Sequence, residues 1–143
     1  MRRSLQRWAG GFSLAAAGAH GFLAPAHLEE WWGYGLVFLA AGAAQAVLGL
    51  ALLTDAFREK DGSWRPGGQR LERAMLGSGI VGTLLLIGLY VVTRTTGIPL
   101  GPGAGVVEEV APIDLVTKVF EVAIVVLLAL LVRLRLRDRT APN

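Results

Sequence analysis

The chain has 143 residues, of which 53% are hydrophobic, and a formal net charge of +3. This length predicts a single domain, too short for a membrane bundle with an added soluble module. The chain has no cysteine, which excludes thiol redox catalysis, disulfides, and zinc or iron–sulfur sites built on cysteine.

Four apolar stretches dominate the sequence. They run roughly over residues 8–24, 34–53, 75–93 and 115–132, and contain no Lys, Arg, Asp or Glu apart from Lys118 and Glu121. Stretches of this length and polarity are typical of transmembrane helices. The sequence therefore predicts an all-α, four-helix transmembrane bundle that forms one domain over residues 1–143.

The charges are divided between the two ends of these helices. Of the 14 Lys and Arg residues, 12 lie in the N-terminal tail, the 54–74 connection and the C-terminal tail. The other two connections hold five acidic residues and one basic residue, Arg94. By the positive-inside rule, both termini and the loop 54–74 are expected in the cytoplasm, and the loop 94–113 on the outer side. We expect a multi-pass protein of a bacterial inner membrane, whose basic residues meet anionic lipid headgroups and not nucleic acid.

The first stretch is rich in glycine and alanine, which favours close helix packing in lipid. Pro25 predicts the end of this helix, and residues 28–32 are expected to form a short interfacial helix with two indoles at headgroup depth. As an alternative, the first 19 residues resemble a signal peptide, whose removal would leave three spans. The apolar run continues through Ala24, so we expect the segment to be retained.

In the second stretch, Gln45 has Gly42 and Gly49 close by on the same helical stripe. This pattern predicts a buried amide that faces another helix. The connection 54–74 has mixed charge and several glycines, which predict an exposed loop. The connection 94–113 is interrupted by glycines and prolines, so we expect little regular structure there.

Two histidines and several carboxylates lie in the outer half of the predicted bundle. His20, His27, Asp114 and Glu121 would converge if the first and fourth helices are neighbours, and Glu30 is a further candidate ligand. Imidazole and carboxylate ligands suit a divalent transition metal such as zinc or copper. Haem is disfavoured, because both histidines come from one segment only seven residues apart.

The fourth stretch carries ionisable residues on one face. Asp114, Lys118 and Glu121 follow four- and three-residue spacing, which places them on the same side of a helix. Ionisable groups inside a membrane normally face the bundle interior or a water-filled cavity. These three residues, with Gln45 and Arg94, are the candidate ligand-binding residues. Alternatively, Lys118 and Glu121 only neutralise each other and Asp114 caps the helix.

These candidates predict an outward-facing polar pocket that binds a metal ion or small ligand, or that belongs to an accessory subunit. One alternative is a structural subunit of a larger membrane complex. Another is a proton-coupled transporter that acts as a homodimer and uses residues 114, 118 and 121 as a relay. No nucleophile–base pair or cofactor fingerprint is evident, so the sequence favours a non-enzymatic role and leaves an enzyme open.

The segments GAHGFLAPAHLEEWWGYGLVFLAAGAAQ and RTTGIPLGPGAG, with a glutamate in the last helix, resemble a group of small four-helix integral membrane proteins of high-GC bacteria. The resemblance implies the membrane fold and brings no activity with it. It also suggests that the polar residues of the outer half act together. The residues that carry the resemblance are His20, His27, Glu30, Trp31, Gln45, Arg94, Gly101, Pro102, Asp114 and Glu121.

Overall fold

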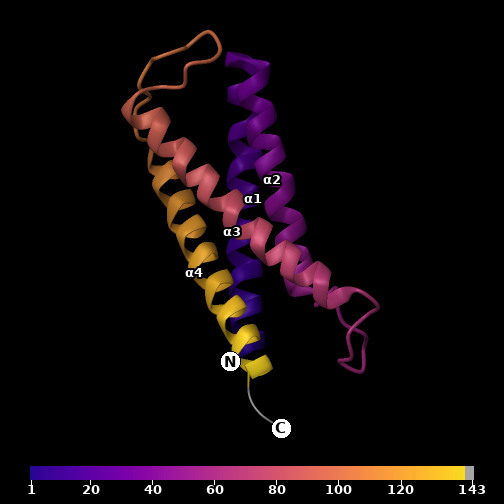
Figure 1. Ribbon diagram of the computed structural model, residues 1–143. Coiled ribbons are helices and arrows are strands. Elements are labelled where there is room, and N and C mark those ends of the chain that lie inside the picture. The colour runs from indigo at the N-terminus through magenta and orange to yellow at the C-terminus, as the bar shows by residue number, and fades with distance from the viewer. Residues whose placement is uncertain (141–143) are drawn as a thin grey trace.

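The computed structural model describes residues 1–140, and the side chains of residues 1–137, as a bundle of four helices (Figure 1). Within these residues there is no strand, only an isolated bridge between Arg58 and Trp64. The all-α, four-helix fold predicted from the sequence is confirmed. The helices are α1 (Arg2–Glu30), α2 (Trp32–Leu53), α3 (Gly68–Thr95) and α4 (Pro112–Thr140).

Three of the helices are long and apolar enough to cross a membrane. They are α2, α3 and the Pro112–Arg137 part of α4, with mean hydropathies of 2.2, 2.1 and 2.6. Their exposed apolar side chains indicate a lipid environment. Helix α1, which covers the first of the four predicted spans, is less apolar because it carries Gln6, Ser13 and His20 among its small residues.

Helix α1 lies between α2 and α4. It packs most extensively on α2 and next on α4, whereas α3 packs on α4 and barely touches α2. Figure 1 shows α3 crossing the bundle obliquely, from the side of α4 at one end toward α2 at the other. The N-terminus, the end of α4 and the loop 54–67 lie at one end of the bundle, and the loop 96–111 at the opposite end. We call the end of the bundle opposite the termini the distal end, and residues 96–111 the distal loop.

The turn between α1 and α2 differs from the sequence-based prediction. Helix α1 continues through Pro25 to Glu30, and only the extended residue Trp31 separates it from α2. The predicted helix end at Ala24 and the separate interfacial helix at 28–32 are therefore wrong. A proline removes one backbone hydrogen bond, which a helix packed along its length on a neighbour tolerates.

The tight turn depends on small residues just after it. A Cβ atom at Gly35 would lie 2.1 Å from Cγ of Leu28 in α1. Glycine at this position therefore lets the start of α2 fold back directly onto the last turn of α1.

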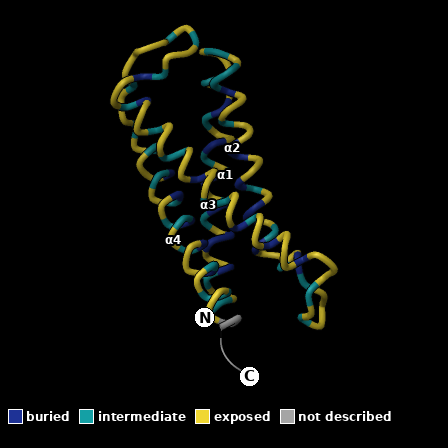
Figure 2. Tube along the Cα trace, in the orientation of Figure 1, coloured by how far each residue is buried: buried dark blue, intermediate teal, exposed yellow. Residues whose placement is uncertain are grey.

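The bundle core fills the half nearest the termini, where buried segments line the facing sides of the helices (Figure 2). Here α1 and α2 approach so closely that a Cβ at Gly49 would lie 2.9 Å from the backbone oxygen of Gly10. Close packing of small residues stabilises helix pairs in lipid, because the hydrophobic effect does not drive helices together there. The core residues are Ala9, Ala16, Leu48, Leu52, Leu76, Ile124, Leu128 and Leu131.

The loop 54–67 folds back on the end of the bundle. The Trp64 ring contacts two guanidinium groups, with Cζ of Arg58 4.2 Å and Cζ of Arg135 5.0 Å from its centroid. Arg135 also donates a 2.5 Å hydrogen bond to the buried Glu72 of α3. These contacts tie the loop, α3 and α4 together at this end.

The close approach of α1 and α2 leads to a stability prediction. Gly49→Ala should destabilise the protein by about 1–3 kcal/mol, because the new methyl group overlaps the backbone of α1. The matched control is Gly77→Ala on α3, where a Cβ would meet no atom within 4 Å. Thermal unfolding in detergent measures both. An equal midpoint for the two variants would contradict the close packing.

Candidate functional site

A cavity of about 230 Å³ lies at the distal end, between the α1–α2 hairpin on one side and α3 and α4 on the other. We call it the distal cavity. Its walls are mostly apolar and aromatic, with a few charged groups. The lining residues are Leu23, Trp31, Gly33, Val37, Phe38, Ala41, Leu86, Leu89, Ile98 and Leu100, with the polar His20, His27, Tyr34, Tyr90, Thr93, Arg94, Glu108, Asp114, Thr117 and Lys118.

A buried charge cluster lies behind one wall of the cavity. The carboxylate of Glu121 on α4 has no exposed surface. Its Oε1 lies 3.0 Å from Nε2 of His20 on α1, and its Oε2 accepts a 2.5 Å hydrogen bond from Nζ of Lys118. A carboxylate at this depth requires such partners, because an unpaired buried charge costs several kcal/mol. The cluster therefore joins α1 to α4.

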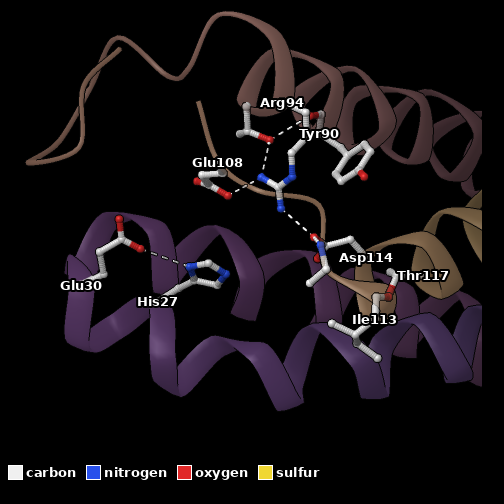
Figure 3. A network of polar contacts seen from close by, with 10 residues as sticks. His27, Glu30, Tyr90, Arg94, Glu108, Ile113, Asp114 and Thr117 are labelled. Carbon is white, nitrogen blue, oxygen red and sulfur yellow. Dashed lines mark hydrogen bonds and ion pairs between the residues drawn. The ribbon is translucent and has the colours of Figure 1, made fainter. Parts of the chain in front are cut away.

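A second charge cluster is centred on Arg94, near the end of α3 (Figure 3). Its guanidinium donates to Oε2 of Glu108 in the distal loop and, at 2.6 Å, to Oδ2 of Asp114 in the first turn of α4. The same Asp114 oxygen accepts the backbone N–H of Ala111 at 3.0 Å. Arg94 thus ties the end of α3 to the distal loop and to the start of α4.

Tyr90 connects the two clusters. Cζ of Arg94 lies 5.0 Å from the centroid of its ring, and Nζ of Lys118 lies 5.2 Å from it. The electron-rich face of a phenol ring attracts both cations. The Tyr90 ring therefore contacts one cation from each cluster, on the α3–α4 side of the cavity.

The opposite side of the cavity is aromatic. The ring of His27 stacks on Phe38 at a centroid distance of 4.1 Å, and the ring of His20 meets Phe38 edge-on at 5.6 Å. Tyr34 donates a 2.6 Å hydrogen bond to the backbone oxygen of Leu100, which fastens the distal loop to α2. The next residue, Gly101, has a φ of +81°, and a Cβ there would lie 2.7 Å from the Tyr34 hydroxyl.

Four of the residues predicted to share a metal ion form two separate pairs. His20 is paired with Glu121, whereas Nδ1 of His27 lies 3.5 Å from Oε2 of Glu30 (Figure 3). Seven residues of helix correspond to a rise of about 10 Å, so the two histidines share a face at different depths. Among the described residues, no group of three or more His, Asp or Glu side chains could hold a metal ion.

The predicted ligand-binding residues do not form one site either. Arg94, Asp114 and Lys118 line the cavity, but Asp114 pairs with Arg94 while Lys118 pairs with Glu121. The stripe on α4 is therefore split between the two clusters. Gln45 is buried outside the lining, and neither its amide nitrogen nor its amide oxygen has a hydrogen-bond partner in the described structure.

Three residues that line the cavity were not predicted from the sequence as part of the site: Phe38, Tyr34 and Glu108. Aromatic residues in apolar helices are common, so Phe38 and Tyr34 gave no signal of their own. The sequence did contain a signal for Glu108. Arg94 is the one basic residue of the outer connections, so an acidic residue of the same loop was the expected ion-pair partner.

Comparison of the chain with protein-family models, curated proteins and solved structures found no match. The resemblance to small four-helix membrane proteins of high-GC bacteria therefore stays a prediction.

The Arg94 cluster predicts how the distal loop is held. Arg94→Gln should raise amide hydrogen exchange in residues 96–111 by roughly tenfold, since a hydrogen bond to a charged group contributes about 1.5 kcal/mol or more. The control is Arg65→Gln, whose ion pair with Glu59 is about half exposed and should leave exchange in this loop unchanged. Unaltered exchange in the Arg94 variant would show that the loop is held by other contacts.

The buried cluster predicts strong coupling between Glu121 and Lys118. Glu121→Gln should destabilise the protein by about 3 kcal/mol, because it leaves the partly buried Lys118 ammonium without its counter-charge. Adding Lys118→Met should recover part of this loss, since no unpaired charge remains. Unfolding of both single variants and the double variant measures the coupling. Simple additivity of the two single losses would contradict the ion pair.

Proposed function

We propose that the protein is an integral membrane protein that binds a small amphiphilic molecule in the distal cavity. The observation that carries this proposal is the cavity itself, which combines apolar and aromatic walls with a few fixed polar groups. Sites for small organic molecules have this composition, because apolar walls bury the body of the ligand and polar groups orient its head.

The position of the cavity supports a ligand drawn from the membrane. The cavity lies between α2 and α3, which scarcely contact each other. Both helices are apolar enough to be in contact with lipid along their length. A molecule dissolved in the bilayer therefore reaches the cavity sideways, between these two helices, without crossing water.

In this proposal α1 is a fourth membrane-crossing helix, and both termini lie in the cytoplasm of a bacterium. The position of α1 between α2 and α4 supports the crossing, because its polar residues Gln6, Ser13 and His20 are buried. The excess of Lys and Arg at the end that holds both termini supports the orientation. The distal cavity then opens in the outer half of an inner membrane.

The same contacts favour a small organic ligand over the other roles considered. The division of His20, His27, Glu30 and Glu121 into two pairs speaks against a metal centre. A relay along α4 would need Asp114, which is engaged by Arg94. A purely structural subunit would have no need of a cavity. Membership of a homo-oligomer or a larger complex is compatible with ligand binding and stays a prediction.

The proposal is tested by filling the cavity. Ala41→Phe places a large ring inside it, and Ala44→Phe, on the exposed side of the same helix, is the matched control. The wild type and Ala44→Phe, purified from membranes in mild detergent, should carry a co-purifying amphiphile in mass spectrometry. Ala41→Phe should lose it while keeping a cooperative unfolding transition.

If the same small molecules accompany all three proteins in equal amounts, they are bound elsewhere on the apolar surface. That result would contradict the proposed function.

A further inference from the structure

We infer that the ligand of the distal cavity is a lipophilic organic cation, with a positively charged head such as an ammonium group on an apolar body. This inference rests on the proposed function and names the chemical class of the ligand. Three observations carry it: the excess of carboxylates around Arg94, the engagement of both basic side chains of the cavity, and the aromatic rings next to the distal loop.

The Arg94 cluster carries excess negative charge. A single guanidinium, that of Arg94, faces the two carboxylates of Glu108 and Asp114. All three side chains line the distal cavity. No histidine is bonded to these groups, so the excess does not depend on the protonation of His20 or His27.

Part of this negative charge is accessible. Each carboxylate binds the guanidinium through one oxygen, Oε2 of Glu108 and Oδ2 of Asp114 (Figure 3). The other two oxygens, Oε1 and Oδ1, accept no hydrogen bond from a described residue, and neither is fully buried. The Glu108 side chain is 38% exposed and that of Asp114 is 14% exposed. A positively charged head in the cavity can therefore approach both carboxylates.

The two basic side chains of the cavity are already engaged. Nη1 of Arg94 donates to Glu108, and Nη2 donates to Asp114. Nζ of Lys118 donates to Glu121, whose carboxylate has no exposed surface and depends on this counter-charge. An anionic head would have to displace a carboxylate from one of these pairs. A cationic head adds a counter-charge where one is missing.

The excess charge attracts a cation without a specific contact. Charges interact over about 8 Å in water at physiological ionic strength, and over a longer range where protein and lipid exclude the water. The cavity is small, about 230 Å³, and both carboxylates border it. A head in the part of the cavity that the distal loop borders therefore lies within the field of both.

Aromatic rings border the same part of the cavity. Trp31 and Tyr34 line it from the turn between α1 and α2, with ring centroids 4.9 Å apart and ring planes at 78°. The distal loop lies against both rings, because a Cβ at Gly101 would lie 2.7 Å from the Tyr34 hydroxyl and 3.0 Å from Cε3 of Trp31. The faces of indole and phenol rings attract cations, and cages of such rings recognise quaternary ammonium groups in proteins.

The deeper part of the cavity suits an apolar body. Leu86 and Leu89 line it from α3, and both precede Arg94, so they lie closer to the middle of the bundle. Apolar walls of this kind bury the body of a ligand while polar groups orient its head. The two ends of the cavity thus match the two parts of a lipophilic cation.

The test compares three probes of similar shape. Phenyltrimethylammonium is positively charged, tert-butylbenzene is its neutral carbon isostere, and benzenesulfonate has a negatively charged tetrahedral head on the same ring. Binding to the protein in a non-ionic maltoside detergent is measured by ligand-observed NMR titration, corrected for the share of each probe dissolved in the micelles. The wild type should bind the cation roughly tenfold more tightly than the neutral probe, and the sulfonate least tightly.

Two variants assign the preference to the Arg94 cluster. Glu108→Gln removes the excess charge and keeps the shape of the side chain, so it should bind the cation roughly tenfold more weakly than the wild type does. The matched control is Glu109→Gln, the same change at the next residue, which is exposed and does not line the cavity. It should keep the preference of the wild type. Unchanged binding of the neutral probe shows that the cavity is intact in both variants.

The outcomes separate the two proposals. Equal binding of the cation and the neutral probe by the wild type, or tighter binding of the sulfonate, would overturn the inference without a variant and leave the proposed function standing. A preference for the cation that survives in Glu108→Gln would also overturn it, because the attracting charge would lie elsewhere. Failure of all three probes to bind would overturn the inference, and with the absence of any co-purifying molecule it would overturn the proposed function as well.

Discussion

The arrangement of the bundle depends on one buried carboxylate. Glu121 lies in an apolar helix with no exposed surface, so its charge is tolerable only if other groups bind it. Lys118, one turn earlier on α4, supplies the counter-charge, and His20 reaches the second oxygen from α1. This requirement places α1 beside α4 and turns the polar face of α1 inward. That face carries Gln6, Ser13 and His20 at seven-residue intervals, all buried.

The cavity follows from the same arrangement. With α1 between α2 and α4, the remaining helix α3 has α4 as its main neighbour and crosses the bundle with little contact to α2. At the distal end the space between α2 and α3 stays open, and the Arg94 cluster holds α3, the distal loop and α4 in that position. Glu121 and Arg94 therefore act as two fixed points, and the apolar walls between them form the proposed ligand site.

Much of the fold was predictable, because a helix in lipid must be long and apolar, and the charges are confined to its ends. The four helices and the gathering of polar residues in one half came from these constraints. The continuation of α1 through Pro25 was not predictable, because packing of α1 on α2 decides whether this proline ends the helix. The division of the predicted metal ligands was not predictable either. Spacing shows that His20 and His27 share a face about 10 Å apart along α1, but only the position of α4 along α1 determines which of them meets Glu121.

The central claim is that α2 and α3 stay apart at the distal end around a bound molecule. A crystal structure of the protein grown from a lipidic mesophase tests this most directly. The account predicts elongated electron density in the distal cavity, with the head of the molecule beside the carboxylates of Glu108 and Asp114. A structure in which α2 and α3 pack together, with the side chains of Phe38 and Tyr90 filling the space between them, would contradict it.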